Sequence, residues 1–320
     1  SKWEKPLLEF YRSNPNFISP STRKNEVISF VKSGLKDLSV SRKSFSWGIP
    51  VPNNKEHVIY VWLDALTNYI SALNYPDTKD NKYKNYWPAD IHMIGKDILR
   101  FHAVYWPAFL LAANLELPKR IFAHGWWTNE GEKISKSLGN IIDPVELVDK
   151  YGLDQVRYFL LREVPFGKDG DFSHRSMVNR MNGDLSNDLG NLAQRVLSMV
   201  FKNCDERVPE PGRLLDDDNF LLGKSTYLIE DLRIAFDSQL FHKSLERIWE
   251  LIRAANSYVD AQAPWALKKR DSERMCTVLY VLCEILRRIA IILQPFMPNT
   301  MSLMLDQLSI EANKRTFFYL

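Results

Sequence analysis

The chain has 320 residues, of which 45% are hydrophobic and 25% charged, so it can bury a full core and should form more than one domain. A formal net charge of +3 is too small to indicate nucleic-acid binding by itself. No apolar run reaches the roughly 18 residues of a membrane-spanning helix, and the first residues lack the pattern of a signal peptide. These features argue against a membrane protein and predict a cytoplasmic one, with the mitochondrial matrix as the alternative.

Residues 1–46 alternate short helical patterns with breaks rich in Pro and Ser. After them, three short apolar runs rich in β-branched and aromatic residues predict strands at 58–62, 90–95 and 120–125. A helical pattern at 98–114 separates the last two runs. Strand, helix and strand in this order predict a parallel sheet.

Long amphipathic helical patterns replace the strand signals from about residue 176 onward. The predicted helices lie at 176–203, 216–237, 241–261, 273–293 and 297–308. We therefore expect an α/β domain followed by an all-α helical bundle. The three cysteines, Cys204, Cys276 and Cys283, have no CxxC spacing, which indicates buried free thiols rather than a zinc site or a disulfide framework.

One loop carries a distinctive charge pattern. Residues 132–140, EKISKSLGN, place Lys133 and Lys136 among serines and glycines, shortly after the aromatic pair Trp126 and Trp127. Flexible residues around paired positive charge are typical of a loop that closes on an anion, most often phosphate. A solvated basic turn is the alternative for any isolated pair of lysines.

The predicted sheet offers a place for a nucleotide. Gly95 and Asp97 follow the strand at 90–95, and an open parallel sheet binds ligands beyond the carboxyl ends of its strands. Gly95 would let a ligand approach the backbone, and Asp97 could accept hydrogen bonds from ribose hydroxyls or cap the next helix. The absence of GxxxxGK[ST] and GxGxxG argues against a P-loop NTPase and a dinucleotide-binding enzyme.

KISKS resembles the Lys-Met-Ser-Lys-Ser signature of class I aminoacyl-tRNA synthetases, with Ile134 in place of methionine. Its surroundings are more specific, because the order of several stretches is that of methionyl-tRNA synthetases: YVWLDALTNYI, MIGKDILRFHAVYWPAFL, HGWWTNEGEKISKSLGN, GNLAQR and AQAPW. The resemblance covers nearly the whole chain and is nearest to the bacterial and mitochondrial branch. It implies the C-terminal half of a Rossmann-like catalytic domain, a helical-bundle anticodon-binding domain, and the activity of a methionine–tRNA ligase.

The resemblance also implies the residues of the first reaction, in which ATP with Mg²⁺ and L-methionine form methionyl-adenylate. Negative charge then develops on the phosphates, and two ammonium groups on a closing loop are suited to stabilise it. The implied catalytic residues are Lys133, Lys136, Ser135 and Ser137, and the implied ATP-binding residues are Gly95, Asp97, Lys133 and Lys136.

Methionine offers a selective pocket only its shape and the preference of sulfur for aromatic edges. The implied methionine-binding residues are Trp62, Ala65, Leu66, Tyr69, Ile98, His102 and Trp106. Leu66 departs from the proline that some members carry at this position. Without the resemblance, the aromatic residues of this set would be interpreted as core packing.

The helical half would read the anticodon of tRNA(Met), including initiator tRNA. Splayed bases are recognised by stacking on aromatic or guanidinium planes and by hydrogen bonds to their edges. The residues that the resemblance implies are Asn191, Arg195, Pro264 and Trp265. Taken alone, a capping Asn and a solvated Arg are the default interpretations.

Two features of the family are missing from the sequence, the His-x-Gly-His signature and the metal-binding knuckle. The sequence therefore predicts a chain that lacks its N-terminal part, binds no zinc and is inactive alone. The predicted regions are a tail of the connective insertion at 1–46, the catalytic half-domain at 47–125, a stem-contact region at 126–175 and the anticodon-binding domain at 176–320. A tRNA-binding module without chemistry is the alternative, a scaffold subunit is a weaker one, and the oligomeric state stays open.

Overall fold

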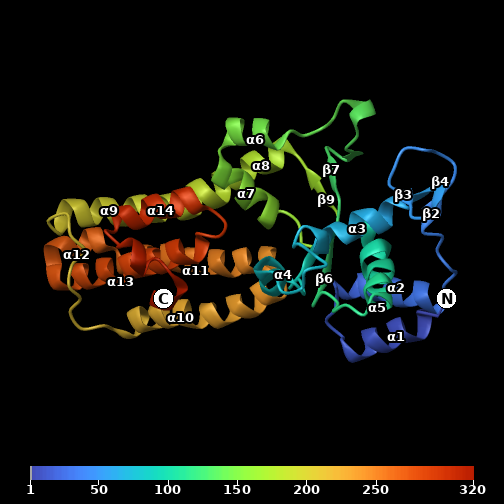
Figure 1. Cartoon of the computed structure of the whole chain (residues 1–320). Helices are drawn as coiled ribbons and strands as arrows, with labels where there is room; N and C mark the ends of the chain where they lie inside the picture. Colours follow the sequence, from blue (N-terminus) through green and yellow to red (C-terminus); the bar gives the residue numbers. More distant parts are fainter. Residues whose placement is uncertain (1) are drawn as a thin grey trace. The chain divides into compact units, whose positions relative to one another are not determined.

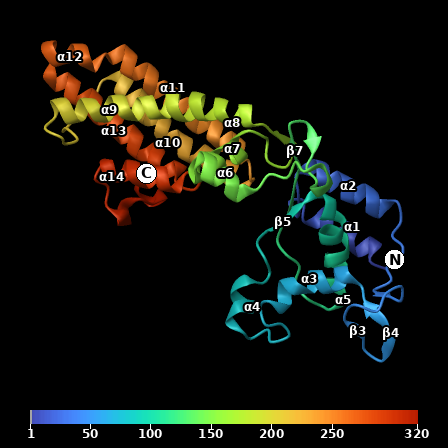
Figure 2. The ribbon, with the colours of Figure 1, turned by 90° about the horizontal axis from the view of Figure 1, so that it is seen from above.

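The computed structural model describes residues 2–320, and of Lys136 it describes the backbone alone. The chain forms two compact units, one ending at Trp126 and one beginning at Trp127. Figures 1 and 2 show the elements of both units from two sides. The finer division at residues 46 and 175 stays a prediction.

A three-stranded parallel sheet forms the centre of the first unit, in the order β1, β6, β5. The two predicted strands β5 (His92–Gly95) and β6 (Ile121–His124) pair in parallel, which confirms that part of the prediction. The third strand, β1 (Ile18–Ser19), pairs in parallel with β6 and was not predicted. Two residues are too few to show an alternating pattern in the sequence.

Helices pack against this sheet through one apolar cluster. The helical patterns within residues 1–46 are confirmed as α1 (Glu4–Ser13) and α2 (Ser21–Lys32). The shared core consists of Leu7, Tyr11, Phe17, Ile18, Val27, Val31, Ile94, Leu99, Ala103, Val104, Ile121 and Ala123. This core fixes the carboxyl end of β5, where the predicted nucleotide residues begin.

The prediction of a strand at residues 58–62 is partly wrong. The strand β4 (Asn54–Ile59) ends at Ile59, and α3 (Val61–Ser71) begins two residues later. Leu66 and Ile70 are buried four residues apart on α3, which is the spacing of one helix face. The apolar run therefore covers a strand end and a helix start, which its periodicity alone cannot separate.

The strand β4 also lies outside the parallel sheet. It pairs antiparallel with β2 (Ser41–Arg42) and β3 (Pro50–Val51) in a separate three-stranded sheet. The sequence predicts all three apolar runs as strands and a parallel sheet, without this distinction. The parallel sheet of the first unit thus has two of the three predicted strands.

The helical pattern at 98–114 is interrupted. A 3₁₀ turn, a π-helical turn and a short helix α5 follow one another at Lys96–Ile98, Phe101–Tyr105 and Trp106–Ala112. Pro107 has no N–H and cannot donate to the carbonyl of Ala103, four residues earlier. The hydroxyl of Tyr11 donates to that carbonyl instead, at 2.5 Å. Pro107 therefore leaves the carbonyl of Ala103 without its helical donor, and Tyr11 supplies the replacement.

The second unit begins with a small sheet in the order β8, β7, β9. Its strands are β7 (Trp127–Asn129), β8 (Glu132–Lys133) and β9 (Gly170–Phe172). The helices that accompany it are α6 (Pro144–Tyr151), α7 (Leu153–Arg162) and α8 (His174–Arg180). The β7–β8 hairpin carries the first lysine of the KISKS loop.

The helical bundle predicted for the C-terminal half is confirmed. Its helices are α9 (Asn191–Asn203), α10 (Asp216–Asp237), α11 (Phe241–Gln262), α12 (Pro264–Arg270), α13 (Ser272–Leu293) and α14 (Pro298–Gln307). Helix α13 packs against α9, α10, α11, α12 and α14, and its second half is buried on nearly all sides (Figure 1). The short helix α12 was not predicted, because Pro264 marked a break in the pattern.

The cysteines are free thiols, as predicted. Cys283 is buried in α13, and burial raises its pKa to about 12. Cys204 and Cys276 are only half-buried, so the prediction of buried thiols holds fully for Cys283 alone. Among the described residues, no helix combines the length and the apolarity needed to cross a bilayer.

Candidate functional site

A tyrosine–histidine pair lies at the centre of the predicted methionine pocket. The hydroxyl of Tyr69 and Nε2 of His102 are 2.9 Å apart, and Nδ1 of His102 is 3.0 Å from the carbonyl oxygen of Ile98. Because a carbonyl only accepts, Nδ1 carries the proton, and in the neutral ring Nε2 accepts from Tyr69. Burial lowers the pKa of His102, which favours this neutral form.

Aromatic rings surround this pair. Trp62 stacks on Phe101 with ring centroids 3.8 Å apart, and it packs edge-to-face with His102 at a centroid distance of 6.2 Å. Trp106 is 2% exposed, and its ring centroid lies 6.2 Å from that of Tyr69. The structure therefore brings Trp62, Tyr69, His102 and Trp106 together in one aromatic cluster of the first unit.

The other predicted pocket residues lie at different depths. Leu66 is buried within the same cluster, and Ala65 lies exposed on α3. Ile98 contributes its carbonyl to His102, whereas its side chain packs against the core around the parallel sheet. Leu66 and Ile98 thus support the pocket by packing and by a backbone acceptor.

The sequence prediction missed a second buried histidine in this cluster. His92 is 5% exposed, and its ring centroid is 4.1 Å from Tyr69 and 6.1 Å from Trp87. Burial lowers its pKa to about 4, with a smaller contribution from His102. His92 and Ile94 alternate with exposed residues in β5, and an inward-facing histidine on a short strand is the signal that could have found it.

Gly95 and Asp97 lie at the carboxyl end of β5, as predicted. A Cβ atom at Gly95 would lie 2.5 Å from Oδ1 of Asp97, so a larger residue there would displace the Asp97 carboxylate. The indole N–H of Trp126 donates to Asp97 Oδ1 at 3.2 Å, and Lys96 Nζ lies 4.3 Å from the Trp126 ring centroid. Asp97 lies inside the 3₁₀ turn and does not cap it, so the capping alternative is wrong.

The KISKS loop is held by an asparagine. Asn140 Oδ1 accepts from the backbone N–H of Ser135 at 2.9 Å, and Asn140 Nδ2 donates to the carbonyl of Lys133 at 3.0 Å. The hydroxyls of Ser135 and Ser137 are 3.2 Å apart. The predicted role of Lys136 concerns a side chain outside the described residues.

Asn140 was not assigned a role from the sequence. Its signal is local, because asparagine often bonds nearby backbone groups and follows Gly139 here, which has φ +66°. Asn129 Nδ2 donates to the Asn140 carbonyl at 3.0 Å, which ties the loop to β7. These bonds therefore hold the backbone of the loop in place, whereas the side chain of Lys133 is exposed.

The predicted anticodon residues meet at one end of the bundle. Asn191 and Arg195 lie one turn apart on α9, as predicted. The Arg195 guanidinium lies 5.5 Å from the ring centroid of Trp265, and its Nη2 lies 2.6 Å from Asp260 Oδ1. Trp265 is 51% exposed, whereas Pro264 is buried at the start of α12. An aromatic face, a guanidinium and a carboxylate are thus presented together.

A π-helical stretch, Met181–Gly190, leads into α9 and sets the position of Asn191. The carbonyl of Asp188 accepts from Asn256 Nδ2 at 3.0 Å, and that of Asp184 accepts from Trp249 Nε1 at 3.4 Å. These bonds from α11 hold the backbone of the wide turn. Asp260, on the same helix, pairs with the predicted anticodon residue Arg195, and sequence reasoning missed it.

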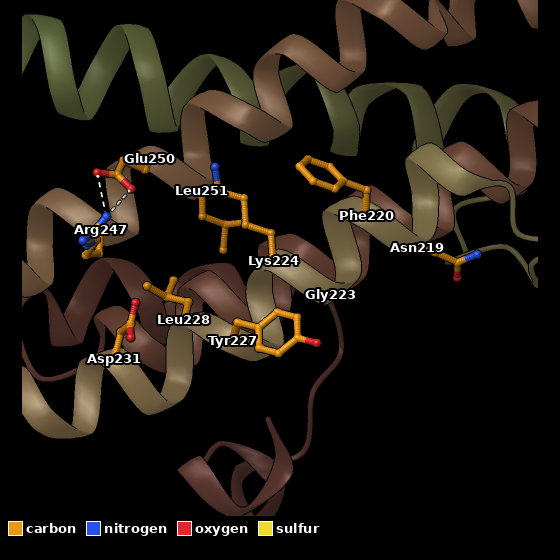
Figure 3. A pocket seen from close by; sticks show the side chains of 10 residues that line it. All are labelled: Asn219, Phe220, Gly223, Lys224, Tyr227, Leu228, Asp231, Arg247, Glu250 and Leu251. Carbon is orange, nitrogen blue, oxygen red and sulfur yellow. Dashed lines mark hydrogen bonds and ion pairs between the residues drawn. The ribbon is translucent and has the colours of Figure 1, made fainter.

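A separate groove lies between α10 and α11. Figure 3 shows its lining, in which Arg247 and Glu250 form an ion pair at 3.1 Å. Its volume is about 470 Å³, and its lining residues are Asn219, Phe220, Gly223, Lys224, Tyr227, Leu228, Asp231, Arg247, Glu250 and Leu251. None of the predicted site residues lines it.

An open parallel sheet with Gly95 and Asp97 at a strand end, a KISKS hairpin and a bundle that presents Trp265 beside Arg195 together define a class I aminoacyl-tRNA synthetase. Comparison with known families agrees. The family described as "tRNA synthetases class I (M)" matches residues 1–197, and the "Anticodon binding domain of methionyl tRNA ligase" matches residues 208–317. The chain belongs to the class I methionyl-tRNA synthetase family.

Individual relatives are similar over the whole chain. The methionine–tRNA ligases of Brucella suis biovar 1 (strain 1330) and Rickettsia felis (strain ATCC VR-1525 / URRWXCal2) are each 58% identical, over 99% and 100% of this chain. The crystal structure of Mycobacterium tuberculosis methionyl-tRNA synthetase bound by methionyl-adenylate superposes with a TM-score of 0.96 at 54% identity, over 100% of this chain and 64% of its own. The chain spans 61% and 63% of the length of the two curated relatives.

Proposed function

We propose that this chain belongs to a methionine–tRNA ligase, which activates L-methionine with ATP and transfers the methionyl group to tRNA(Met). The observation that carries the proposal is the Tyr69–His102 hydrogen bond inside an aromatic cluster, where the family resemblance implies the methionine-binding residues. A module that only binds tRNA has no use for such a buried polar pair, so this observation disfavours the non-catalytic alternative. The names of the relatives and the methionyl-adenylate in the M. tuberculosis structure support the same proposal.

The pocket chemistry fits a thioether side chain. Tyr69 donates a hydrogen bond to His102, which leaves the lone pairs of the tyrosine oxygen to accept from a donor such as the ammonium group of the ligand. The neutral form of His102 keeps the pocket uncharged, and the edges of Trp62 and Trp106 offer the contacts that sulfur prefers. Shape and aromatic edges would then select methionine over polar amino acids.

Adenylate formation requires stabilisation of phosphate charge. A carboxylate oxygen of methionine attacks the α-phosphorus of ATP, and pyrophosphate leaves with its Mg²⁺. We assign Lys133 and Lys136 to the developing charge and Ser135 and Ser137 to hydrogen bonds within the loop. Gly95 and Asp97 would bind the adenosine, with Asp97 accepting from the ribose.

The first test concerns the pocket. Tyr69→Phe should raise the KM for methionine about tenfold, because the hydrogen bond to His102 and the oxygen facing the ligand are lost. The KM for ATP should stay within about twofold. ATP–pyrophosphate exchange measures both, in a protein that carries this chain together with a His-x-Gly-His signature.

Tyr75→Phe is the matched control, since Tyr75 packs in the same cluster against Tyr83, with ring centroids 6.0 Å apart, whereas the hydrogen bond to His102 comes from Tyr69. It should leave both constants at the parent values. If Tyr69→Phe changed the KM for methionine and the KM for ATP equally, Tyr69 would be a packing residue. The support for a methionine pocket would then be removed.

The anticodon surface gives the second test. Trp265→Ala should weaken binding of this chain to a stem-loop with a CAU anticodon by about 1 to 3 kcal/mol, the contribution of one stacked base. Fluorescence anisotropy with labelled CAU and scrambled stem-loops measures the loss at fixed salt. Binding to the scrambled loop should change little, because backbone contacts dominate nonspecific affinity.

Tyr227→Ala is the control for the α10–α11 groove. Tyr227 is 80% exposed beside Lys224, so the groove also offers an aromatic ring and a positive charge to RNA (Figure 3). If Tyr227→Ala abolished selective binding and Trp265→Ala did not, RNA would be bound in the groove, and the assignment of Asn191, Arg195, Pro264 and Trp265 would be wrong.

The proposal extends to the finer features of the family. We propose that Mg²⁺ accompanies ATP, that no zinc is bound by this chain, that initiator tRNA is among the partners, and that the protein works in the cytoplasm. The family resemblance supports the statements on Mg²⁺, initiator tRNA and the cytoplasm, and the missing metal-binding knuckle supports the statement on zinc. In the described part of the chain, no group of three His, Cys, Asp or Glu side chains is arranged to hold a metal ion.

A further inference from the structure

A buried carboxylate joins three elements of the bundle behind the anticodon surface. Asp218, on α10, is 0% exposed, and its two oxygens accept from Arg274 Nη1 at 2.5 Å and Nη2 at 2.8 Å. It also accepts from the Tyr258 hydroxyl at 2.5 Å and from the backbone N–H of Leu215 at 2.8 Å. Four donors therefore fix the position of the Asp218 side chain, and one residue, Arg274 near the start of α13, supplies two of them.

The charges in this network are matched. Burial alone would raise the pKa of Asp218, but hydrogen bonds from Arg274 and Tyr258 outweigh it and lower the pKa. The same bond to Asp218 raises the pKa of Arg274. A bidentate pair of this kind fixes both partners in orientation as well as in charge.

Arg274 also reaches both ends of α12. Its Nη2 donates to Gln262 Oε1 at 2.7 Å, and Gln262 is the last residue of α11. Its backbone N–H donates to Asp271 Oδ1 at 2.9 Å, and Asp271 directly follows α12. Gln262 is held a second time, because its Nε2 donates to Asp217 Oδ2 at 3.0 Å.

Helix α12 depends on such anchors. It has seven residues, which is too short for a helix that is stable by itself. The residue between Gln262 and Pro264 is Ala263 with φ 42°, a left-handed conformation that costs an alanine energy and must be enforced by its neighbours. Trp265 is the second residue of this helix, so the corner at Ala263 decides where its ring points.

We infer that Gln262 and Arg274 are positioning residues that hold Trp265 beside Arg195 in the orientation that stacks an anticodon base. The inference rests on the proposed anticodon function and adds two residues that do not contact the RNA. A stacking surface that is already ordered loses less entropy when it binds, so affinity and selectivity both depend on the anchors.

The test is Gln262→Met in the 320-residue chain. Methionine matches glutamine in length but neither accepts from Arg274 nor donates to Asp217, while Asp218 keeps Arg274 and Tyr258. We expect the affinity for the CAU stem-loop to fall about tenfold, the effect of losing a hydrogen bond to a charged group. Affinity for a scrambled stem-loop should stay within about twofold.

A spectroscopic readout follows the ring itself. In a chain labelled with 5-fluorotryptophan, the resonances of Trp265 and Trp249 are assigned by their loss in Trp265→Phe and Trp249→Phe. Gln262→Met should shift or broaden the Trp265 resonance without RNA present. The resonance of Trp249, which is 1% exposed in the bundle core, should not move.

Gln294→Met is the matched control. Gln294 follows the last residue of α13 and donates to the carbonyl of Arg315 at 2.8 Å. It lies about 30 Å from Arg274 along the helix, at about 1.5 Å per residue. This variant loses a comparable hydrogen bond, and it should keep the parent affinity and the parent Trp265 resonance.

Arg274→Lys supplies a second variant, which keeps the charge beside Asp218 but cannot bridge Asp218 and Gln262 with one planar fork. It should move the Trp265 resonance in the same direction as Gln262→Met. An unchanged Trp265 resonance in both variants would overturn the inference, whatever the RNA result. If the parent chain bound CAU and scrambled loops equally, the anticodon function would fail, and the resonance would still decide whether these residues position Trp265.

Discussion

Lys136→Ala is expected to slow methionine-dependent ATP–pyrophosphate exchange by about a hundredfold or more, while the KM for methionine changes little. The reason is that an ammonium group aimed at developing phosphate charge acts mainly in the transition state. Loss of one such donor costs about 2.7 kcal/mol or more. The assay requires a protein in which this chain accompanies a His-x-Gly-His signature.

Lys150→Ala is the control, since Lys150 is also an exposed lysine of the second unit, near the end of α6. It should exchange at the parent rate. A Lys136→Ala protein that matched Lys150→Ala would show that KISKS is a solvated basic turn. Asn140→Ala offers an intermediate case, because it removes the bonds to Ser135 and Lys133 and leaves both lysines in place.

The second large effect is a loss of stability in acid that depends on His92. Its pKa is lowered from 6.5 to about 4 in the folded chain. Between these two values the unfolded chain binds the proton more strongly, so the free energy of unfolding rises with pH over this window. The contribution present at neutral pH is about 3 kcal/mol, and it is lost as pH falls through 6.5 towards 4.

His92→Phe removes the titrating group and keeps a ring against Tyr69 and Trp87. The free energy of unfolding of the first unit can be followed at pH 4.5 and 7 from hydrogen exchange of the β5 and β6 amides. We expect the difference between the two pH values to shrink by about 2 to 3 kcal/mol in the variant. Burial also lowers the pKa of His102, which accounts for any remaining slope.

An equal pH dependence in the parent and the variant would contradict this account. It would mean that the pKa of His92 stays near its ordinary value of 6.5 in the folded chain, so that the ring is protonated below that pH. The pocket around Tyr69 would then carry a positive charge, and its fit to an uncharged thioether would be poor.

The sequence by itself was sufficient for the family and for most of the helices. The order and spacing of the motifs identified the methionyl-tRNA synthetase family. The helical repeat of apolar residues predicted a helix at residues 216–237, which are the observed bounds of α10. Local signals were enough here, because a long amphipathic helix repeats its pattern many times. Asn191 and Arg195 could be placed on one helix for the same reason.

Tertiary structure decided the features that depend on partners far away in the chain. Whether 58–62 continues as a strand or turns into a helix depends on what Leu66 and Ile70 pack against. The π turn before Trp106 depends on a hydroxyl from Tyr11, 92 residues earlier. Neither the packing partners of Leu66 and Ile70 nor the hydroxyl of Tyr11 can be recognised from the residues close to these segments in the sequence.

The sites divide in the same way. Motif matching named Tyr69, His102, Arg195 and Trp265, but it could not show that His92 packs on Tyr69 or that Asp260 pairs with Arg195. A buried histidine and a surface aspartate look ordinary in a sequence, because their roles come from neighbours on other elements. Residue types and spacing determined the family and the candidate residues, and packing between distant segments decided how each group is charged, oriented and exposed.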